Sequence, residues 1–546
     1  MKLTHAVRRT AAALLLSLAV GCVSSFFPYF TTRAAAAAFL PYDDIRTNYA
    51  TEAIVNMTKL QLLTGTGYRR FEPDKSVTRA EFITMIERLL GIQPAASPIP
   101  AFADVQSSAW YYEWLQPAVQ LQLAEGTTAA LFQPNRPVTR EEAAVILARA
   151  LKQSSSELSS DLPEGLFEDQ ERIHEWAASS VYRLYQLDLM DGDDGRFLPQ
   201  EQMTRQEAAV VMNRIWTHAG WSDQLHSASP ENIQLGWQYG QTTSQFEQTV
   251  LQSNINTLSP HWYYLGKSAI VEDQSDLSLL GWAHSRGKRV WAMVGNHADQ
   301  AATHGMLANP ATRQSFVRQL ADRVKKSGID GLNIDFENML PADRNSFTAF
   351  VSSLRQELQA IPAVLTVNVS PDLGTDWTEV FDYEAIAAHT DYVVLMGYDE
   401  HWGGDPQAGS VSSLPWLKQG IETLLLKAPA DKVILALPLY TRDWTMDGKV
   451  LAASQDIDIN KQNSVVLAKK LRPLWDDRLG QYTAQYADGS RNHRIWIEDG
   501  RSLSMKAAMG ESYDLAGNAY WYMGGESPDI WTSLRNEARF HSYSFL

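Results

Sequence analysis

The feature that most constrains the fold of this chain is a threefold repeat in its first half. The segments "FEPDKSVTRAEF" (71–82), "FQPNRPVTREEA" (132–143) and "FLPQEQMTRQEA" (197–208) share the pattern F-x-P-x4-T-R-x-E without a gap. Each segment follows an acidic start, an apolar helical stretch and a glycine turn. Self-similarity of this kind is typical of stacked, related units. The pattern therefore predicts three related helical units in the first half.

Each repeated segment also predicts the start of a helix. Thr-x-x-Glu before an apolar run is a capping box, in which the two side chains satisfy backbone N–H groups at the helix start. The pairs are Thr78/Glu81, Thr139/Glu142 and Thr204/Glu207. A capping box does not explain the arginine that follows the threonine each time, at Arg79, Arg140 and Arg205. A guanidinium beside a helix N-terminus can bind an anion such as a carboxylate, and the alternative is three surface arginines.

On these motifs, residues 39–216 resemble three surface-layer homology (SLH) repeats, which we place at 39–92, 99–152 and 163–217. The resemblance implies an all-helical, pseudo-threefold unit that binds pyruvylated secondary cell-wall polysaccharide. Arg79, Arg140 and Arg205 would then contact the ketal carboxylates. Glu141 and Gln206 stand where the family has alanine, which could weaken individual binding pockets.

The N-terminus has the pattern of an export signal, which we place at residues 1–38. Lys2, Arg8 and Arg9 precede an apolar stretch, and an alanine run at 34–38 offers cleavage sites. The alternatives are a retained membrane anchor, for which the stretch is short, and lipidation at Cys22. Because Cys22 is the only cysteine, a chain cut at the alanines would have no disulfide. We expect a secreted protein of a bacterial cell wall, outside the membrane after cleavage.

Length and charge limit the possible functions. At 546 residues the chain is long enough for several buried cores. Its formal net charge of −16 argues against a nucleic-acid-binding protein, which would need a basic face. The sequence also has no glycine-rich phosphate loop and no Cys/His cluster at metal-ligand spacing.

The second half alternates short apolar runs with amphipathic helical stretches. The strand candidates are "IQLGW", "INTLSPHWYYL", "RVWAMVG", "GLNIDFEN", "AVLTVNVSP", "YVVLMGYD", "KVILALPLY" and "AGNAYWYMG". Eight strands with helices between them predict a (β/α)8 barrel over residues 231–546, and a doubly wound open sheet is the alternative. The segment "GQYTAQYADGSRNHRIWIEDG" predicts a small α+β insertion with a hairpin between the seventh and eighth strands.

The fourth strand candidate, "DGLNIDFEN", carries polar residues at every second position. Strand side chains alternate between faces, so Asn333, Asp335 and Glu337 share one face. In a barrel, the C-terminal end of such a strand lies at the active site. A solvated strand face and a metal site built from two carboxylates and an amide are the alternatives.

These residues resemble the signature of family 18 glycoside hydrolases, D-x-x-D-x-D-x-E, with Asn333 replacing its middle aspartate. Further elements of the family match "LMGYD" (395–399), "LPLYTRDW" (437–444) and Trp521, so the resemblance covers most of 231–546. The branch it resembles contains bacterial N-acetylglucosaminidases associated with the cell wall and spore cortex.

The resemblance implies substrate-assisted hydrolysis with retained configuration and no cofactor or metal. Glu337 would be the general acid and base, Asp335 would hold the substrate acetamido N–H, and Tyr398 would orient its carbonyl. The other implied substrate-binding residues are Asn333, Met396, Asp399, Tyr440, Arg442 and Trp521. For Tyr440 and Trp521, packing in the core is the alternative. The neutral Asn333 is expected to donate a hydrogen bond to Asp335, and Asp335 should then stay ionised to lower pH than it would beside an aspartate at position 333.

Taken together, the motifs predict a wall-attached glycoside hydrolase that cleaves β-linked N-acetylglucosamine in peptidoglycan or a chitin-like polymer. A wall-bound lectin-like protein with an inactive barrel is the alternative. The acid at Glu337 argues against it, because binding alone does not need a general acid.

Overall fold

The structure is a computed structural model that describes residues 40–153, 163, 165–228, 231–448 and 450–545. The predicted export signal and Cys22 lie outside the described residues. Within the described ranges, no helix is both long and apolar enough to cross a membrane.

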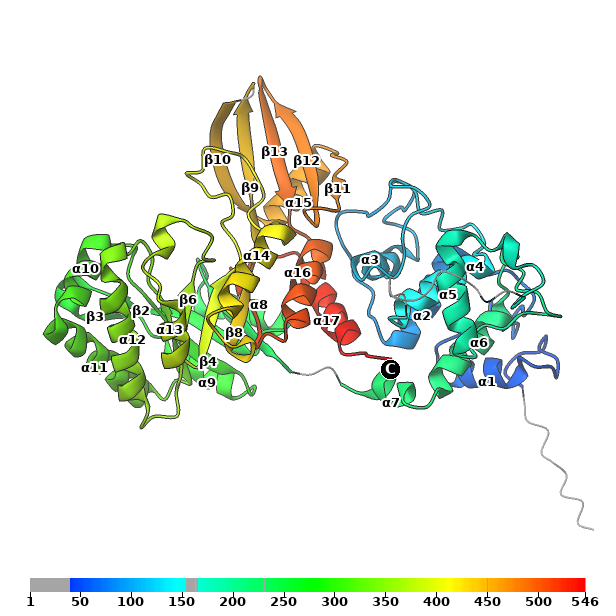
Figure 1. The fold of residues 1–546 in the computed structure, drawn as a ribbon, viewed down its shortest axis with the longest axis horizontal. Coiled ribbons are helices and arrows are strands. Elements are labelled where there is room, and N and C mark those ends of the chain that lie inside the picture. The colour runs from blue at the N-terminus through cyan, green and yellow to red at the C-terminus, as the bar shows by residue number, and fades with distance from the viewer. Residues whose placement is uncertain (1–39, 154–162, 164, 229–230, 449, 546) are drawn as a thin grey trace, which may run out of the picture. The chain divides into compact units, whose positions relative to one another are not determined.

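The first half of the chain is helical, with two helices for each sequence repeat (Figure 1). The helices are α1 (Thr51–Lys59), α2 (Arg79–Leu90), α3 (Tyr112–Gln120), α4 (Arg140–Ala150), α5 (Glu175–Gln186), α6 (Arg205–Thr217) and the short α7 (Trp221–His226). Helix α2 packs against α3, α4 against α5, and α6 against α1. The second helix of each repeat therefore contacts the first helix of the next, and the third repeat returns to the first.

Three backbone hydrogen bonds show the same closure at the centre of this unit. The Val77 N–H donates to the Met203 carbonyl oxygen at 2.9 Å, and the Met203 N–H donates to the Val138 carbonyl oxygen at 3.0 Å. The Val138 N–H donates back to the Val77 carbonyl oxygen at 2.9 Å. All three side chains are fully buried. This cyclic arrangement confirms the predicted pseudo-threefold helical unit.

The predicted capping boxes are also present. Thr78, Thr139 and Thr204 each accept from the backbone N–H three residues on, and the glutamate there accepts from the threonine N–H. The acidic residue that opens each repeat has a similar local role, because it accepts two backbone N–H groups from the later F-x-P segment. These residues are Asp44, Asp104 and Asp169.

The second half contains a closed barrel of eight parallel strands. In chain order they are β1 (Ile233–Gln238), β2 (Thr257–Leu265), β4 (Arg289–Gly295), β5 (Gly331–Asp335), β6 (Val364–Val369), β7 (Tyr392–Met396), β8 (Val433–Pro438) and β14 (Gly517–Trp521). Strand β1 pairs with both β2 and β14, so the sheet has no open edge and the predicted barrel, rather than an open sheet, is confirmed. A short strand, β3 (Val271–Asp273), pairs antiparallel with β2.

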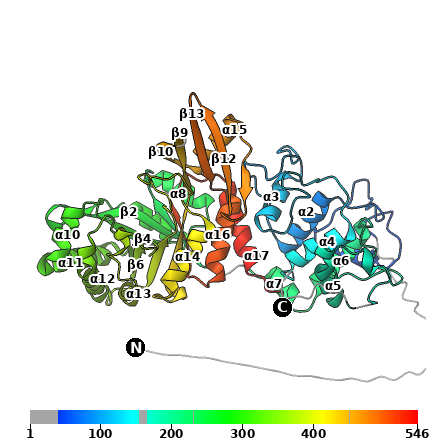
Figure 2. The same cartoon turned by 45° about the horizontal axis from the view of Figure 1, so that its top comes forward.

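Helices surround the barrel strands (Figures 1 and 2). They are α8 (Thr243–Gln252), α9 (Leu277–His284), α10 (Gln300–Ala308), α11 (Pro310–Ser327), α12 (Arg344–Leu358), α13 (Tyr383–His389), α14 (Leu414–Leu425), α16 (Gly500–Ser512) and α17 (Asp529–His541). Strand β5 follows the predicted alternation, with Leu332 and Ile334 packed in the core beneath these helices. Asn333 and Asp335 occupy the other face, which points into the barrel.

The insertion between β8 and β14 is a five-stranded antiparallel sheet with one helix, and its strands extend away from the barrel (Figure 2). Its elements are β9 (Tyr440–Asp447), β10 (Val450–Asp458), α15 (Ile459–Ala468), β11 (Leu474–Asp476), β12 (Gln481–Asp488) and β13 (Arg491–Ile497). The predicted hairpin is β12–β13. Tyr440 and Arg442, expected on the seventh barrel strand, lie instead on β9, because the chain leaves the barrel after Pro438 and pairs with β10 and β13.

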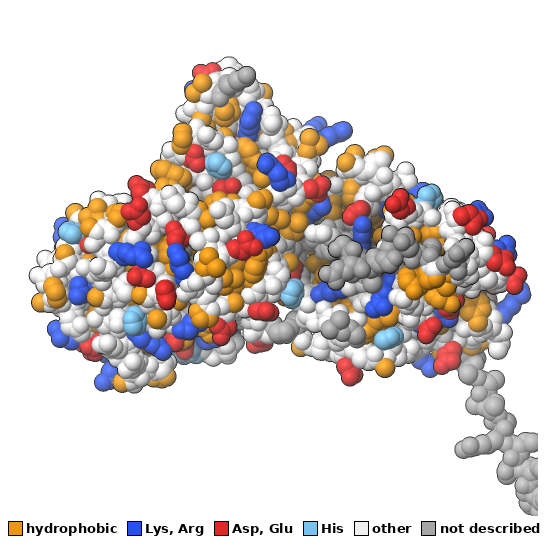
Figure 3. All heavy atoms as spheres, viewed as in Figure 1, with side chains coloured by type: hydrophobic (Ala, Val, Ile, Leu, Met, Phe, Trp, Pro, Cys, Tyr) orange, Lys and Arg blue, Asp and Glu red, His pale blue; other side chains and the backbone are white. Residues whose placement is uncertain are grey.

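The face shown in Figure 3 mixes side chains of both charge signs, with no continuous basic stripe.

Candidate active site

The predicted catalytic residues meet at the C-terminal ends of the barrel strands. Asp335 is the last residue of β5, and Glu337 follows in the loop. A cavity of about 590 Å³ opens here, lined by Glu337 together with Met396, Tyr398 and Asp399 from the end of β7 and its loop. The fold therefore brings together residues from distant parts of the sequence.

Asn296, which follows β4, holds the backbone of Glu337 in place. Its Nδ2 donates to the Glu337 carbonyl oxygen at 2.7 Å, and its Oδ1 accepts from the Glu337 N–H at 3.0 Å. Asn296 is 1% exposed, so this double contact is protected from water. The sequence interpretation missed this residue, although its place just after the third barrel strand could have indicated a role.

Asp335 is buried and has a neutral hydrogen-bond partner. Asn368 on β6 donates from Nδ2 to Asp335 Oδ1 at 2.9 Å. Burial raises the pKa of Asp335 to about 6, while the hydrogen bond from Asn368 acts in the opposite direction. The sequence interpretation also missed Asn368.

The charge of Asp335 affects its neighbour Glu337. The Asp335 carboxylate, together with desolvation and Asp399, raises the pKa of Glu337 to about 7. Glu337 is exposed in the cleft, so a substrate can reach it. Two nearby carboxyl groups whose pKa values are both raised suit a site in which one group transfers a proton near neutral pH.

The expected contact between Asn333 and Asp335 is wrong. Asn333 donates from Nδ2 to Thr366 Oγ1 and Asn368 Oδ1, both at 2.7 Å, and it accepts from Trp237 Nε1 at 2.8 Å. Asn368 thus lies between the two β5 residues and makes the contact with Asp335. Burial outweighs the hydrogen bond from Asn368 and raises the pKa of Asp335. That Asp335 stays ionised to lower pH beside Asn333 than beside an aspartate stays a prediction.

Tyr398, Asp399 and Tyr440 form a second group at the cleft. The Tyr440 hydroxyl donates to Asp399 Oδ1 at 2.5 Å, and the Tyr398 and Tyr440 rings lie edge to face with centroids 6.2 Å apart. Burial raises the pKa of Asp399, and the Tyr440 hydrogen bond and the charge of Arg442 oppose this. Tyr440 is 5% exposed, so it both packs in the barrel interior and holds a cleft carboxylate.

Trp521, at the end of β14, is half-buried among other aromatic side chains. Its ring stacks on His261 at 5.7 Å and lies 5.3 Å from the ring of Tyr239. The Trp521–Tyr522 peptide bond is cis. Burial lowers the pKa of His261 to about 4, so this imidazole is neutral. The sequence interpretation did not identify His261 or Tyr239.

Comparison with known proteins identifies both halves of the chain. Residues 247–526 match the glycosyl hydrolases family 18, and residues 41–83, 101–144 and 166–209 match the S-layer homology domain. The chain belongs to glycosyl hydrolase family 18. It is a chitinase-like glycosidase with three SLH repeats.

Relatives and solved structures support this assignment. The chain is 27% identical over 321 residues, 56% of its length and 92% of the relative, to the uncharacterized glycosylase YvbX of Bacillus subtilis. It is 25% identical over 311 residues, 53% of its length and 70% of the relative, to the cortical fragment-lytic enzyme of the same organism. A chitinase from Chromobacterium violaceum shares the barrel fold, with a TM-score of 0.52 at 22% identity over 56% of this chain and 99% of that chain.

One position of the family 18 signature lies away from the chemistry. Asp330 precedes β5, and its Oδ2 accepts from the Val290 N–H at 2.7 Å and lies 2.9 Å from His284 Nε2. Since these contacts are at the N-terminal end of the strand, Asp330 stabilises the join between β4 and β5.

The three SLH arginines hold successive repeats together. Each guanidinium donates from Nε to the carbonyl oxygen of the phenylalanine that opens the next F-x-P segment. The pairs are Arg79–Phe132 at 3.0 Å, Arg140–Phe197 at 2.8 Å and Arg205–Phe71 at 2.7 Å. Their contact with a polymer carboxylate stays a prediction. A cavity of about 480 Å³ lies beside Arg140 and is also lined by Tyr49 and Arg214.

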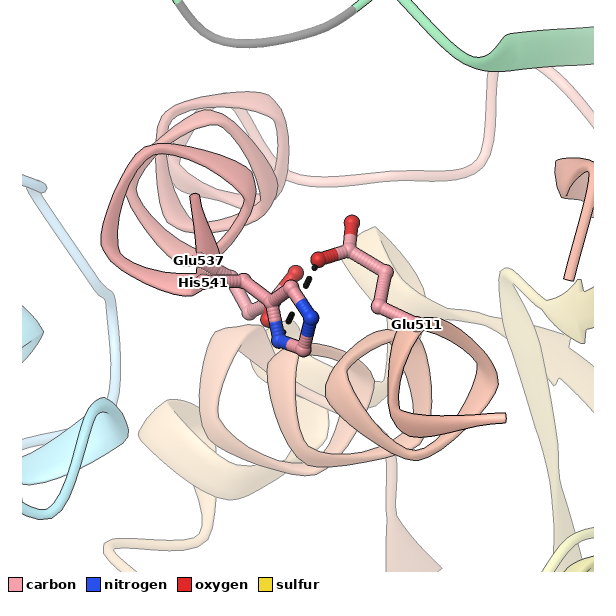
Figure 4. Close-up of side chains that lie close together, drawn as sticks. All are labelled: Glu511, Glu537 and His541. Carbon is pink, nitrogen blue, oxygen red and sulfur yellow. Dashed lines mark ion pairs between the residues drawn. The ribbon is translucent and has the colours of Figure 1, made fainter. Parts of the chain in front are cut away.

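A further group of titratable side chains lies outside the cleft, on α16 and α17 (Figure 4). Glu511, Glu537 and His541 each place one possible ligand atom within 4.8 Å of the others, an arrangement that could hold a metal ion. Burial raises the pKa of Glu511 to about 7 and that of Glu537 well above its usual value. Burial and the positive charge of Lys152 lower the pKa of His541. The raised pKa values mean that Glu511 and Glu537 are buried at lower free-energy cost when their carboxyl groups are protonated.

Proposed function

We propose that this family 18 protein is a wall-attached glycosidase that cleaves β-linked N-acetylglucosamine polymers with retention of configuration. The observation that carries the proposal is the arrangement of Asp335 and Glu337, in which a buried carboxylate raises the pKa of an accessible one. A general acid that is protonated near neutral pH is what glycosidic bond cleavage requires.

The proposed mechanism uses the substrate acetamido group as the nucleophile. Glu337 donates its proton to the glycosidic oxygen while the acetamido carbonyl oxygen bonds to the anomeric carbon and the glycosidic bond breaks. Asp335 accepts a hydrogen bond from the acetamido N–H and stabilises the positive charge of the cyclic intermediate. Glu337 then removes a proton from water. The water oxygen bonds to the anomeric carbon, and the bond between that carbon and the acetamido oxygen breaks, which restores the acetamido group.

The remaining cleft residues would position the sugar during these steps. Tyr398 would donate a hydrogen bond to the acetamido carbonyl oxygen. Asp399, in the same loop, would assist in positioning the acetamido group. Trp521 would lie under the sugar ring, because its half-buried indole ends β14 at the C-terminal side of the barrel, where the catalytic carboxyl groups also lie. Met396, Tyr440 and Arg442 would line the cleft around them.

The SLH repeats, taken as residues 39–92, 99–152 and 163–217, would attach the enzyme to the bacterial cell surface. Their proposed ligand is a cell-wall polysaccharide that carries pyruvate ketals. Such attachment places the barrel beside peptidoglycan, and the similarity to a cortical fragment-lytic enzyme supports that substrate. Chitin-like polymers are the second substrate class, which the fold of the C. violaceum chitinase brings into consideration.

The replacement of Glu337 by glutamine tests the proposal. Glu337→Gln keeps the shape of the side chain and removes its transferable proton, so kcat should fall by at least about a hundredfold. Hydrolysis of 4-nitrophenyl β-chitobioside and of chitin oligosaccharides measures this loss. The control is Glu384→Gln, an exposed carboxylate on α13. Near-normal turnover in Glu337→Gln would show that another group is the acid.

The lectin-like alternative makes the opposite prediction for the same experiment. An inactive barrel would bind oligosaccharides but release no 4-nitrophenol, and Glu337→Gln would leave binding unchanged.

A further inference from the structure

Three tryptophans line the same active-site cavity as Glu337. Trp377 lies in the loop after β6, Trp402 in the loop after β7, and Trp416 in the first turn of α14. Trp377 and Trp402 are 45% and 44% exposed, and their rings meet edge to face with centroids 6.2 Å apart. Paired, exposed indoles at the mouth of a cavity indicate a binding surface, because isolated folded proteins rarely leave such apolar area uncovered.

The position of Glu337 indicates which part of the substrate would lie on this surface. Glu337 lines the cavity, whereas Trp521, His261 and Tyr239 are not among its lining residues. In the proposed mechanism Trp521 lies under the sugar whose bond breaks, and Glu337 donates its proton to the departing oxygen. The group that departs therefore lies toward Trp377 and Trp402.

The charges around this cavity disfavour an anionic ligand. Its lining includes the carboxyl groups of Glu337, Asp399, Glu400 and Asp405, and none of the described lining residues is Lys, Arg or His. A carboxylate brought into this cavity would lose water and meet four carboxyl groups but no cationic lining residue.

The polar groups beside these acids include one guanidinium, because burial raises the pKa of Asp399 and the charge of Arg442 opposes this. Asp405 Oδ2 lies 2.9 Å from His401 Nδ1, and Glu400 accepts from the N–H and hydroxyl of Ser413 at 2.7 and 3.0 Å. The guanidinium of Arg442, which lies beside the same loop at Gly403, donates to Ser454 Oγ at 3.3 Å.

We propose that this cavity binds the leaving-group sugar by packing it on Trp377 and Trp402, and that it selects a neutral sugar over one with a free carboxylate. The proposal rests on the proposed glycosidase function and adds a specificity to it. In a chitin-like polymer the leaving sugar is neutral N-acetylglucosamine. In peptidoglycan strands stripped of peptide it carries a free lactyl carboxylate, and the acidic lining should disfavour it.

Three substrates used with the full-length protein separate the relevant contacts. 4-Nitrophenyl β-chitobioside has an aryl leaving group, chitin oligosaccharides have a neutral sugar, and peptide-free peptidoglycan strands have a carboxylated one. The same strands with the lactyl carboxylate converted to an amide keep the shape and remove the charge. We expect kcat/KM to be at least about tenfold higher for amidated than for untreated strands.

Tryptophan variants test the binding surface directly. Trp377→Ala and Trp402→Ala should lower kcat/KM on chitin oligosaccharides and on amidated strands by about tenfold, mainly through KM. Unchanged far-UV circular dichroism and Tm show that the variants fold. Trp110→Ala, which removes an indole that is 59% exposed in the SLH unit, is the matched control.

The outcomes distinguish the two proposals. Lack of turnover by the wild type on every substrate would overturn the proposed function and this assignment with it. Normal turnover of the aryl chitobioside, combined with equal rates on charged and amidated strands or with unchanged tryptophan variants on oligosaccharides, would overturn this assignment alone.

Discussion

Replacing Asn368 by leucine tests how the structure controls the protonation of Asp335. Asn368→Leu keeps a similar volume and removes the Nδ2 donor that lies 2.9 Å from Asp335 Oδ1. A hydrogen bond to a charged group contributes about 1.5–3 kcal/mol. One pKa unit corresponds to about 1.4 kcal/mol. Loss of the donor should therefore raise the pKa of Asp335 by about one to two units.

The assay is the pH dependence of kcat/KM on 4-nitrophenyl β-chitobioside. In the proposed mechanism Asp335 acts ionised and Glu337 acts protonated, so kcat/KM rises as the first loses its proton and falls as the second does. With pKa values raised to about 6 and about 7, the wild type should have a narrow optimum between these values. In Asn368→Leu the acid limb should move to higher pH and the maximum should fall, since the two groups titrate together.

A matched control comes from Thr366, which, like Asn368, accepts a hydrogen bond from Asn333 Nδ2. Thr366→Val removes the hydroxyl that accepts from Asn333 Nδ2 at 2.7 Å without changing the donor to Asp335. Its acid limb should stay at the wild-type pH. If Asn368→Leu also kept the wild-type acid limb, the reasoning that Asn368 favours the charged form of Asp335 would be refuted.

Two further predictions concern the SLH unit and the last barrel helices. Arg205→Ala removes donors to the carbonyl oxygens of Phe71 and Thr64 and should lower the free energy of unfolding by about 2–5 kcal/mol, measured by urea unfolding. The control is Arg149→Ala, which loses a partly exposed ion pair. An effect of Arg205→Ala no larger than that of the control would contradict the prediction. The raised pKa of Glu511 (about 7) and that of Glu537 mean that stability is greatest with both protonated and is lost as pH rises from about 4.5 through 7. Glu537→Gln should reduce the loss of Tm between pH 5 and pH 7.5, and an unchanged loss would argue against this pair as its source.

The role of Arg205 also affects how wall binding should be tested. Because each repeated arginine joins two repeats, replacing Arg79, Arg140 and Arg205 by alanine should abolish binding to sacculi through lost structure as well as through lost contacts. Binding and unfolding should therefore be measured on the same variants. Retained binding to sacculi by a folded triple variant would contradict the predicted carboxylate contacts.

Local and periodic features of this protein were predictable from its sequence. The capping boxes at Thr78, Thr139 and Thr204 depend on residues three apart, and the alternation of Leu332 and Ile334 with Asn333 and Asp335 depends on the pleat of a single strand. The same holds for the barrel and its insertion, because eight apolar runs and a hairpin pattern occur in chain order. These features follow from spacing, which a sequence displays directly.

The tertiary structure decided what depends on groups that are distant in the sequence. Asn296 and Asn368 reach Glu337 and Asp335 from neighbouring strands, and only their packing shows that Asn333 contacts Asp335 through Asn368. Burial determines the raised pKa of Asp335, and the charge of Asp335 then raises that of Glu337. The repeated arginines likewise show their structural role only when the third repeat meets the first. Desolvation and charge interactions depend on distances in space, which residue order alone does not specify.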